Sequence, residues 1–348
     1  MPLTRKSQSP NSMLRFRSPL TLRRSRSAKS QIPNKIQKKI VFIVGPTAVG
    51  KSETAVALAK RIKGEIISCD SMQVYKGMDI ITSKPSPSLR KMVRHHLIGV
   101  KSPSKEYDVS QYRKEALKKI KEIIKRGKPP IFAGGTGLYM SILIDGIFDL
   151  KSKNNAIRKR FLRLAETRGS SFIYKKLQLV DPEASAKIHP HDAKRIVRAL
   201  EVFEIAGKPI SQLQKQRKGL SDEYKINIIG LDRKRDELYR LIDERVDKMF
   251  DRGLEQEACK LLKSKLSRTA GFAIGLREFK GYFDGLYNLE ETRRLIKRNT
   301  RQYAKRQLTW FRKDKRIKWV KIDGKKNPLT VANEILGKIK DRRWSERY

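Results

Sequence analysis

After residue 39, the chain alternates between short apolar runs and longer stretches with helical spacing. The apolar runs predict buried strands at residues 40–45, 64–71, 225–232 and 317–323. Apolar positions three and four residues apart predict helices at residues 51–62, 111–127, 236–253 and 290–313. The segment 129–139 predicts another strand, a glycine turn and a helix start. Strands that alternate with helices indicate an α/β fold with a parallel sheet.

A different pattern occupies residues 150–220, where helical spacing with basic outer faces replaces the strand pattern. We interpret this segment as a helical insertion. The chain is therefore expected to divide into a basic, disordered N-terminal extension (1–38), a first part of the core (39–150), the insertion (151–220), the rest of the core with long basic helices (221–325) and a C-terminal helix or tail (326–348).

Positive charge dominates the composition. The chain has 81 lysines and arginines against 36 aspartates and glutamates, a formal net charge of +45 at pH 7. The positive electrostatic field of a chain with this charge attracts polyanions, so the composition favours a nucleic-acid partner. The two cysteines, Cys69 and Cys259, predict neither a disulfide framework nor a zinc module, so we expect a reducing compartment. No apolar run approaches the roughly 18 residues that span a membrane, so no membrane association is expected.

Residues 1–38 are rich in arginine and serine and contain no acidic residue. This composition is typical of an organellar transit peptide, and also of a disordered basic tail. Neither would belong to the folded part of the chain. We expect a cytoplasmic bacterial protein, or an organellar one if this segment is a transit peptide.

The segment GPTAVGKS links the first predicted strand to the first predicted helix. It fits the phosphate-loop pattern G-x-x-x-x-G-K-[ST] in the strand–loop–helix setting that the pattern requires. Backbone amides, the helix N-terminus and the lysine ammonium attract phosphate, and the serine hydroxyl can hold Mg²⁺. The expected fold class is a P-loop NTPase-like parallel sheet with a helical insertion. The predicted diphosphate-binding residues are Gly45, Pro46, Thr47, Ala48, Val49, Gly50, Lys51 and Ser52.

Two further polar residues lie at the ends of predicted strands, Asp70 at the end of the strand at 64–71 and Thr136 in the glycine turn that ends the strand beginning at 129. Open α/β sheets bind ligands at the carboxyl ends of their strands, so both side chains are expected beside the phosphate loop. Asp70 can hold Mg²⁺, act as a general base or cap the turn that follows, and its position leaves these roles open. His95 and His96 are adjacent, so their side chains diverge, and we predict that they are structural.

Two predicted helices carry basic residues at helical spacing. One holds Lys194, Arg195 and Arg198. The other interleaves its basic residues with aromatic ones, namely Arg298, Arg301, Lys305 and Arg312 with Tyr303, Trp310 and Phe311. A solvated basic face is one interpretation. Guanidinium groups beside aromatic rings also suit an RNA with unstacked bases, which is the interpretation that the total charge favours.

Five motifs in this order resemble the tRNA dimethylallyltransferases, also called tRNA isopentenyltransferases. They are GPTAVGKS, DSMQVYKGMDI with TSKP after it, AGGTGLY, RALEVFEIAGKPIS and TRQYAKRQLTWFR. The resemblance covers residues 40–320. It implies that the phosphate loop holds the diphosphate of dimethylallyl diphosphate, with Mg²⁺. It also implies transfer of the dimethylallyl group to N6 of the adenine immediately 3′ of the tRNA anticodon, by an enzyme that we expect to be a monomer.

The resemblance also implies roles for single residues. Asp70 is expected to be the general base, Thr136 to bond the oxygen that bridges prenyl group and diphosphate, and Arg235 to help bind the diphosphate. Residues matching stretches that contact tRNA are Asp70, Ser71, Met72, Gln73, Thr136, Arg158, Lys194, Arg195, Arg198, Arg301, Lys305, Arg306 and Gln307. The chain departs from the family pattern at Ile81, Leu241 and Leu276, none of them a proposed catalytic group.

Three alternative functions remain open at this point. An adenylate isopentenyltransferase, acting on free AMP, ADP or ATP, would share the loop and the acid but would not need the basic insertion. A P-loop kinase or NTPase would turn over a nucleotide. A non-enzymatic RNA-binding protein would leave the phosphate loop and Asp70 unexplained. The Cys/His finger of many eukaryotic cytosolic relatives does not occur in this sequence, so a bacterial or organellar enzyme is expected.

Overall fold

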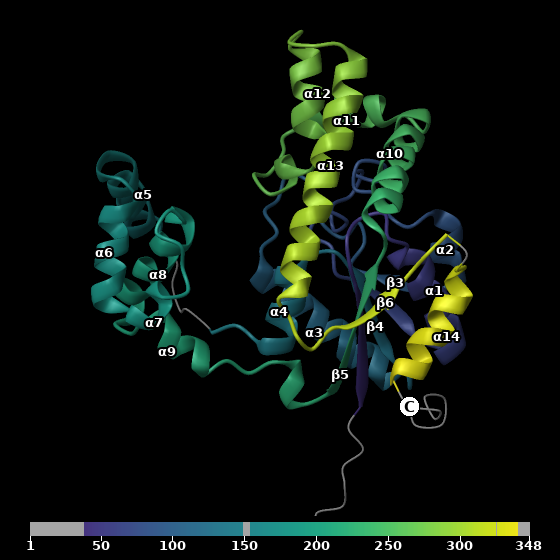
Figure 1. The fold of residues 1–348 in the computed structure, drawn as a ribbon, viewed down its shortest axis with the longest axis horizontal. Coiled ribbons are helices and arrows are strands. Elements are labelled where there is room, and N and C mark those ends of the chain that lie inside the picture. Colours follow the sequence, from purple (N-terminus) through teal and green to yellow (C-terminus); the bar gives the residue numbers. More distant parts are fainter. Residues whose placement is uncertain (1–37, 149–153, 325, 340–348) are drawn as a thin grey trace, which may run out of the picture. The chain divides into compact units, whose positions relative to one another are not determined.

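A computed structural model of the chain describes residues 38–148, 154–324 and 326–339. Within these residues, six parallel strands form one sheet in the order β3-β2-β4-β1-β5-β6 (Figure 1). The strands are β1 (Lys39–Val44), β2 (Glu65–Ser68), β3 (His95–His96), β4 (Pro130–Gly134), β5 (Lys225–Asp232) and β6 (Lys318–Lys321). All strands run in one direction, so all their carboxyl ends meet at one edge of the sheet.

Helices cover both faces of the sheet, with α1 (Lys51–Ile62) and α14 (Pro328–Ile339) on one face and α3 (Val109–Lys125) and α4 (Gly137–Asp145) on the other (Figure 1). The two faces follow from alternation along β1. Phe42 packs with the α3 and α4 side, whereas Val41 and Ile43 pack with the α1 and α14 side. Phe42 stacks on Phe132 of β4 with ring centroids 4.5 Å apart.

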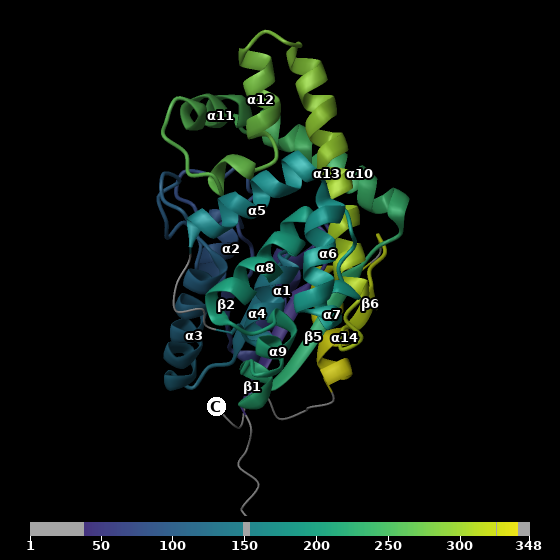
Figure 2. The same cartoon turned by 90° about the vertical axis from the view of Figure 1, so that its left-hand side faces the viewer.

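Two further groups of helices follow in the chain. The segment between α4 and β5 contains α5 (Asn155–Arg168), α6 (Ser170–Val180), α7 (Pro182–Ser185), α8 (Ala193–Ala206) and α9 (Ile210–Lys215), which gather around their own hydrophobic cluster (Figure 2). After β5 come α10 (Arg235–Asp251), α11 (Leu254–Leu262), α12 (Leu276–Phe283) and α13 (Leu289–Arg312). Shorter elements are α2 (Pro87–Met92) and the 3₁₀ turns η1 (Leu220–Asp222) and η2 (Ala270–Phe272).

The predicted α/β core is confirmed, with some changes at the ends of elements. The strand predicted at 64–71 ends at Ser68, so Asp70 lies in the loop beyond it. The predictions for residues 1–37 lie outside the described residues. No helix in the described part of the chain is long and apolar enough to cross a membrane.

The edge strand β3 was not predicted, and it explains the paired histidines. Its two residues pair with Ile66 and Ile67 of β2. The His96 imidazole then reaches the buried carboxylate of Glu65, with Nε2 and Oε2 2.7 Å apart. Arg126 Nη2, just after α3, donates to the same oxygen at 2.7 Å. His96 therefore has structural surroundings, as the sequence predicted, whereas His95 lines the pocket beside the phosphate loop.

Candidate active site at the carboxyl ends of the strands

The phosphate loop connects β1 to α1 at the carboxyl edge of the sheet. Gly50 caps α1 with φ +100°, and Gly45 has φ +146°. A Cβ atom at Gly45 would lie 2.6 Å from the Leu231 carbonyl oxygen of β5, so the loop needs glycine there. Ala48 also has positive φ, +63°, an uncommon conformation for a residue with a side chain. Local backbone geometry thus matches the predicted diphosphate cradle.

Lys51 begins α1 and lines the pocket above the loop. Its ammonium donates a hydrogen bond to the Pro46 carbonyl oxygen at 2.6 Å. Burial and, after it, the nearby positive charge of Arg245 lower the pKa of Lys51 from 10.5 to about 8, against the opposing effect of the Asp70 and Glu53 carboxylates. A bound diphosphate would favour the charged ammonium and reverse this shift.

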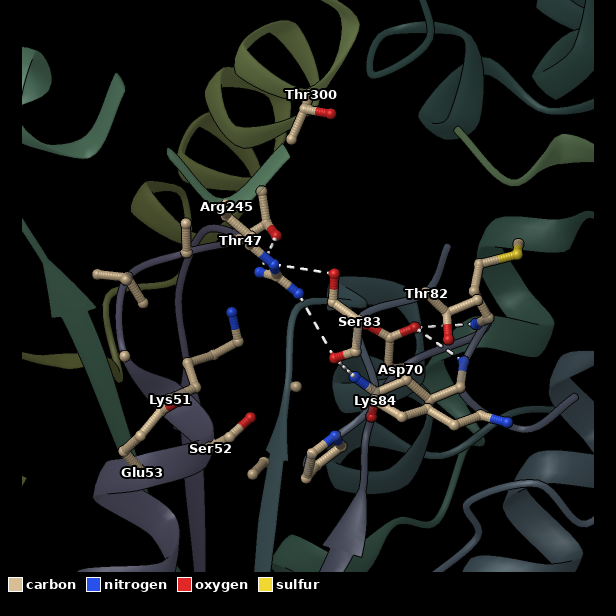
Figure 3. A pocket seen from close by; sticks show the side chains of 18 of the residues that line it. Thr47, Lys51, Ser52, Glu53, Asp70, Thr82, Ser83, Lys84, Arg245 and Thr300 are labelled. Atoms are coloured by element: carbon tan, nitrogen blue, oxygen red, sulfur yellow. Dashed lines mark hydrogen bonds between the residues drawn. The ribbon is translucent and has the colours of Figure 1, made fainter. Parts of the chain in front are cut away.

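Among the described residues, Arg245 of α10 is one of two arginines that the structure places against the phosphate loop, and the sequence analysis missed both. The other, Arg233, donates from its Nε to the Val49 carbonyl oxygen at 3.4 Å. The Arg245 Nη1 donates to Thr47 Oγ1 at 2.9 Å, and its Nε donates to Ser83 Oγ at 2.9 Å (Figure 3). Burial lowers its pKa, while the carboxylates of Glu53 and Asp70 act in the opposite direction. The sequence did contain a signal for this position. Arg245 lies seven residues, or about two helical turns, after the buried Leu238, so both residues lie on the face of α10 that packs against the protein.

The predicted Arg235 has a different environment. It is exposed at the first turn of α10, and its guanidinium lies over the Tyr239 ring, 5.2 Å from the centroid. Within the described residues, the pocket lining includes Arg233 and Arg245 but not Arg235. The geometry therefore favours Arg245 and Arg233, rather than Arg235, as the arginines that can reach a diphosphate in the loop.

Asp70 and Thr136 are brought together through the backbone of Ser71. Thr136 Oγ1 accepts a hydrogen bond from the Ser71 N–H at 3.0 Å. Asp70 Oδ1 accepts from the N–H groups of Met72 at 2.9 Å and Gln73 at 3.3 Å. One oxygen of the Asp70 carboxylate thus caps the turn, which is one of the roles that the sequence left open. These hydrogen bonds also fix the orientation of the carboxyl group, which lines the pocket.

Gln307 of α13 ties the phosphate loop to the glycine turn after β4. Its Oε1 accepts from the Thr47 N–H at 2.8 Å, and its Nε2 donates to the Gly135 carbonyl oxygen at 2.9 Å. The side chain is buried. Both ends of its amide are engaged inside the protein, which gives Gln307 a positioning role at this site. Its side chain also lines the pocket, so the predicted contact with tRNA stays a prediction.

The pocket has a volume of about 910 Å³ and is lined by both polar and apolar side chains. Its polar wall carries Lys51, Ser52, Asp70 and Arg245 (Figure 3). Its apolar wall consists of Ile81, Leu241, Val246, Met249 and Ile296, of which Leu241, Val246 and Met249 lie on the same helix, α10, as Arg245. Two of the residues at which the chain departs from the family pattern, Ile81 and Leu241, lie in this apolar wall. A ligand with a charged head and a hydrocarbon tail matches this division.

The segment that carries Ser83 is held by a carboxylate from another helix. Glu257 of α11 accepts hydrogen bonds from three consecutive backbone N–H groups, those of Asp79 at 3.1 Å, Ile80 at 2.9 Å and Ile81 at 2.9 Å. Ser83 itself has φ +47°, a conformation with a cost for a residue other than glycine. These contacts keep the Ser83 hydroxyl in place for Arg245.

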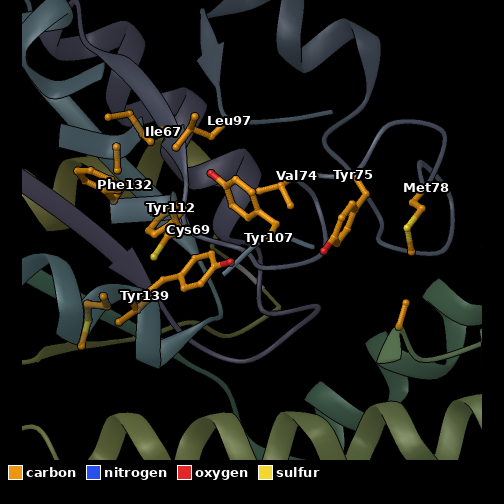
Figure 4. Close-up of a cluster of buried hydrophobic side chains, with 14 of the residues drawn as sticks. Ile67, Cys69, Val74, Tyr75, Met78, Leu97, Tyr107, Tyr112, Phe132 and Tyr139 are labelled. Atoms are coloured by element: carbon orange, nitrogen blue, oxygen red, sulfur yellow. The ribbon is translucent and has the colours of Figure 1, made fainter. Parts of the chain in front are cut away.

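A cluster of buried aromatic rings lies next to the Asp70 loop (Figure 4). Tyr112 of α3 stacks on Tyr139 of α4 with centroids 3.8 Å apart, and its hydroxyl donates to the Ser68 carbonyl oxygen at 3.1 Å. Burial raises the pKa of the adjacent Cys69 thiol to about 12, so this cysteine is a packing residue and not a nucleophile. The cluster gives the loop after β2 a rigid base.

Of the residues predicted to contact tRNA, five lie in the loop after β2 and the turn before α4, namely Asp70, Ser71, Met72, Gln73 and Thr136, and the others lie on α5, α8 and α13. Arg158, Lys194, Arg195, Lys305 and Arg306 are exposed. Two of the others form ion pairs, Arg198 with Glu201 at 3.0 Å and Arg301 with Asp243 at 2.6 Å. Arg306 lines the pocket.

A Mg²⁺ ion is compatible with the polar wall. Within the described residues, no group of three or more histidine, cysteine, aspartate or glutamate side chains could hold a metal. Mg²⁺ usually takes one or two protein oxygens and completes its shell with phosphate oxygens and water. The Ser52 hydroxyl and the Asp70 carboxylate line the same pocket. They fit an ion that binds together with a diphosphate.

Comparison with known proteins places this site in a family. The model of the IPP transferase family matches residues 73–314. A tRNA dimethylallyltransferase of Geobacter sulfurreducens is 45% identical over 302 residues, which cover 86% of this chain and 97% of that protein. Another, of a Thermoanaerobacter species, is 48% identical over 303 residues, which cover 86% and 96%.

Solved structures agree with the sequence relatives. The full-length tRNA isopentenylpyrophosphate transferase of Bacillus halodurans is similar with a TM-score of 0.64 and 40% identity, over 87% of this chain and 97% of that chain. A eukaryotic dimethylallyltransferase acting on tRNA is similar with a TM-score of 0.69 and 33% identity, over 82% and 74%. The resemblance predicted from the motifs is confirmed, and the chain belongs to the IPP transferase family.

Proposed function

We propose that this protein transfers the dimethylallyl group of dimethylallyl diphosphate to N6 of the adenine immediately 3′ of the anticodon, position 37, in tRNA, and releases diphosphate. The observation that carries the proposal is the mixed lining of the pocket. The phosphate loop with Lys51, the Arg245 guanidinium, the Asp70 carboxylate and several apolar side chains all line the same pocket. The named relatives, tRNA dimethylallyltransferases, support the same substrates.

The reaction needs a stabilised leaving group. As the bond between the allylic carbon and the bridging oxygen breaks, its electron pair stays on the diphosphate, which gains negative charge. Loop amides, the Lys51 ammonium and the Arg245 guanidinium are arranged where that charge develops. Mg²⁺, held by the Ser52 hydroxyl, would neutralise part of the same charge when bound. The apolar wall with Ile81 and Met249 accommodates the dimethylallyl group and keeps water away from it.

The nucleophile needs a proton acceptor. The lone pair of an exocyclic adenine amine is delocalised into the ring, so N6 is a weak nucleophile. As N6 forms its bond to the allylic carbon, one of its protons moves to the Asp70 carboxylate, which is oriented by the Met72 and Gln73 N–H groups. Thr136, fixed by the Ser71 N–H, supplies a hydroxyl beside the bridging oxygen. The adenine reaches this position only after it leaves the base stack.

The tRNA would be bound by basic residues on α5, α8 and α13, whose exposed members include Arg158, Lys194 and Lys305. Salt would weaken this binding because counterions are released from the RNA. The enzyme acts as a monomer in the cytoplasm under this proposal.

The test is transfer of label from dimethylallyl diphosphate to unmodified tRNA, with and without Mg²⁺, followed by analysis of the modified nucleoside. We expect labelled N6-(dimethylallyl)adenosine at one position. Transfer to AMP but not to tRNA would instead identify an adenylate isopentenyltransferase. ATP consumption without prenyl transfer would identify a kinase or NTPase.

A further inference from the structure

Phe272 is an exposed aromatic side chain at the pocket. It belongs to the 3₁₀ turn η2 and is 68% exposed. Single exposed apolar residues are common on protein surfaces and need no explanation by themselves. Phe272 differs from the others, because among the large exposed hydrophobic side chains of the described residues it is the one that lines the pocket. Its ring is therefore presented to whatever enters there.

The turn that carries Phe272 is anchored on both sides. Ala270 and Ala273, on either side of the exposed turn, are 0% and 4% exposed. Glu106 accepts hydrogen bonds from the Arg268 N–H at 2.8 Å and from the Thr269 hydroxyl at 2.6 Å. The exposure of the ring is thus a property of a fixed turn, and an ordered aromatic surface loses little entropy when it binds a flat ligand.

The surroundings of the ring are basic and open. The Arg268 guanidinium lies over the Phe272 ring, 6.0 Å from its centroid. Arg306 and Tyr303 of α13 also line the pocket, with the Arg306 guanidinium 5.8 Å from the Tyr303 centroid. A Cβ atom added to the neighbouring Gly271 would meet no atom within 4 Å other than its chain neighbours, so the turn itself is open at this position. Aromatic surface beside guanidinium groups is the chemistry that binds unstacked bases and their phosphates.

We propose that Phe272 is a base-stacking platform for a nucleobase of the tRNA anticodon loop next to the adenine that enters the pocket. This inference rests on the proposed function. Removing the target adenine from the loop exposes the faces of its neighbours, and a phenyl ring at the pocket mouth covers one of them. The dimethylallyl group is not the ligand of this ring, because the apolar wall with Val246 and Met249 lies in the buried part of the pocket.

The experiment measures binding of an unmodified anticodon stem-loop that carries 2-aminopurine next to the target adenine. Base–aromatic stacking predicts that F272A weakens binding roughly 5- to 30-fold, that F272L is nearly as weak because leucine has no flat π face, and that F272W restores binding. Stacking on the ring also quenches 2-aminopurine fluorescence in the wild type and in F272W but not in F272L. The KM for dimethylallyl diphosphate should not change.

The matched control is F283A, which removes a phenyl ring that is 43% exposed on α12 and does not line the pocket. It should bind the stem-loop as the wild type does. Binding of the stem-loop by F272A within twofold of the wild type, or full binding by F272L, would overturn the proposal. A wild-type protein that transfers no prenyl group and binds no stem-loop would refute the proposed function together with it.

Discussion

The side chain of Gln307 joins two segments of the active site that are far apart in sequence. Its amide oxygen accepts from the Thr47 N–H at 2.8 Å, and its amide nitrogen donates to the Gly135 carbonyl oxygen at 2.9 Å. Thr47 and Gln307 are 260 positions apart. The long helix α13 therefore sets the distance between the phosphate loop and the turn that carries Thr136.

Replacing Gln307 by leucine should leave the Thr47 N–H and the Gly135 carbonyl oxygen buried without partners. Each such group costs about 1–3 kcal/mol, so the thermal unfolding temperature should fall and the KM for dimethylallyl diphosphate should rise. Q302A, at an exposed position of the same helix, is the control. Equal stability of Q307L and Q302A would contradict the positioning role.

Substitutions of Arg245, which the structure places at the phosphate loop, and of Arg235, which the family resemblance implied, can show which arginine binds the diphosphate. R245A removes a charged hydrogen-bond donor at the phosphate loop. Because a hydrogen bond to a charged group contributes about 1.5–3 kcal/mol, the KM for dimethylallyl diphosphate should rise about 10- to 100-fold. R235A should change it less than twofold. Steady-state kinetics at saturating tRNA measures both. A larger effect of R235A would restore the role that the resemblance implied.

Asp70→Asn should separate proton transfer from turn formation. The asparagine Oδ1 can still accept from the Met72 and Gln73 N–H groups, so the fold and the KM values should be kept. Loss of the general base should lower kcat by about 10²- to 10⁴-fold. Single-turnover transfer to tRNA is the measurement, with Asp70→Ala as the comparison because it also loses the turn contacts. Near-normal turnover by Asp70→Asn would exclude proton transfer to this residue.

Lys51 predicts a pH dependence for substrate capture. Its pKa in the free enzyme is lowered to about 8, so the ammonium is charged below that pH and loses its proton above it. The ratio kcat/KM for dimethylallyl diphosphate should therefore fall above pH 8. A bound diphosphate raises the pKa again, so kcat should stay level to higher pH. K51R, which keeps its charge, should show no such fall; the same profile in both enzymes would assign it to another group.

Glu65 predicts sensitivity to acid at the opposite end of the sheet. Burial would raise the pKa of its carboxyl, but hydrogen bonds from Arg126, His96 and Lys128 outweigh burial and lower it from 4.5 to about 2. The stability that this carboxylate contributes is thus present above pH 4.5 and lost as the pH falls towards 2. E65Q should lower the free energy of unfolding by about 3 kcal/mol at pH 7. In denaturant titrations, the free energy of unfolding of E65Q should also change less with pH between 4.5 and 2 than that of the wild type. E122Q, at a partly exposed pair with Lys119, should cost little.

Much of the core could be predicted because its signals are local. Helix α1 and strand β5 begin and end where the apolar pattern predicted, at Lys51–Ile62 and Lys225–Asp232. The glycine and lysine positions of the phosphate loop are consecutive in the chain, so their chemistry was readable from the pattern. The two-residue strand β3 was missed, because so short a strand has no periodicity and exists only through pairing with β2.

The sequence by itself determined the parallel α/β core, the phosphate loop and the family, since these depend on periodicity and on short ordered motifs. Only the tertiary structure decided which distant side chains meet there. It placed Arg245 and not Arg235 beside Thr47, turned Gln307 inward, and presented Phe272 at the pocket. Helix α10 carries three arginines of equal helix propensity, Arg235, Arg240 and Arg245, so which of them faces the loop depends on packing against the sheet and not on composition.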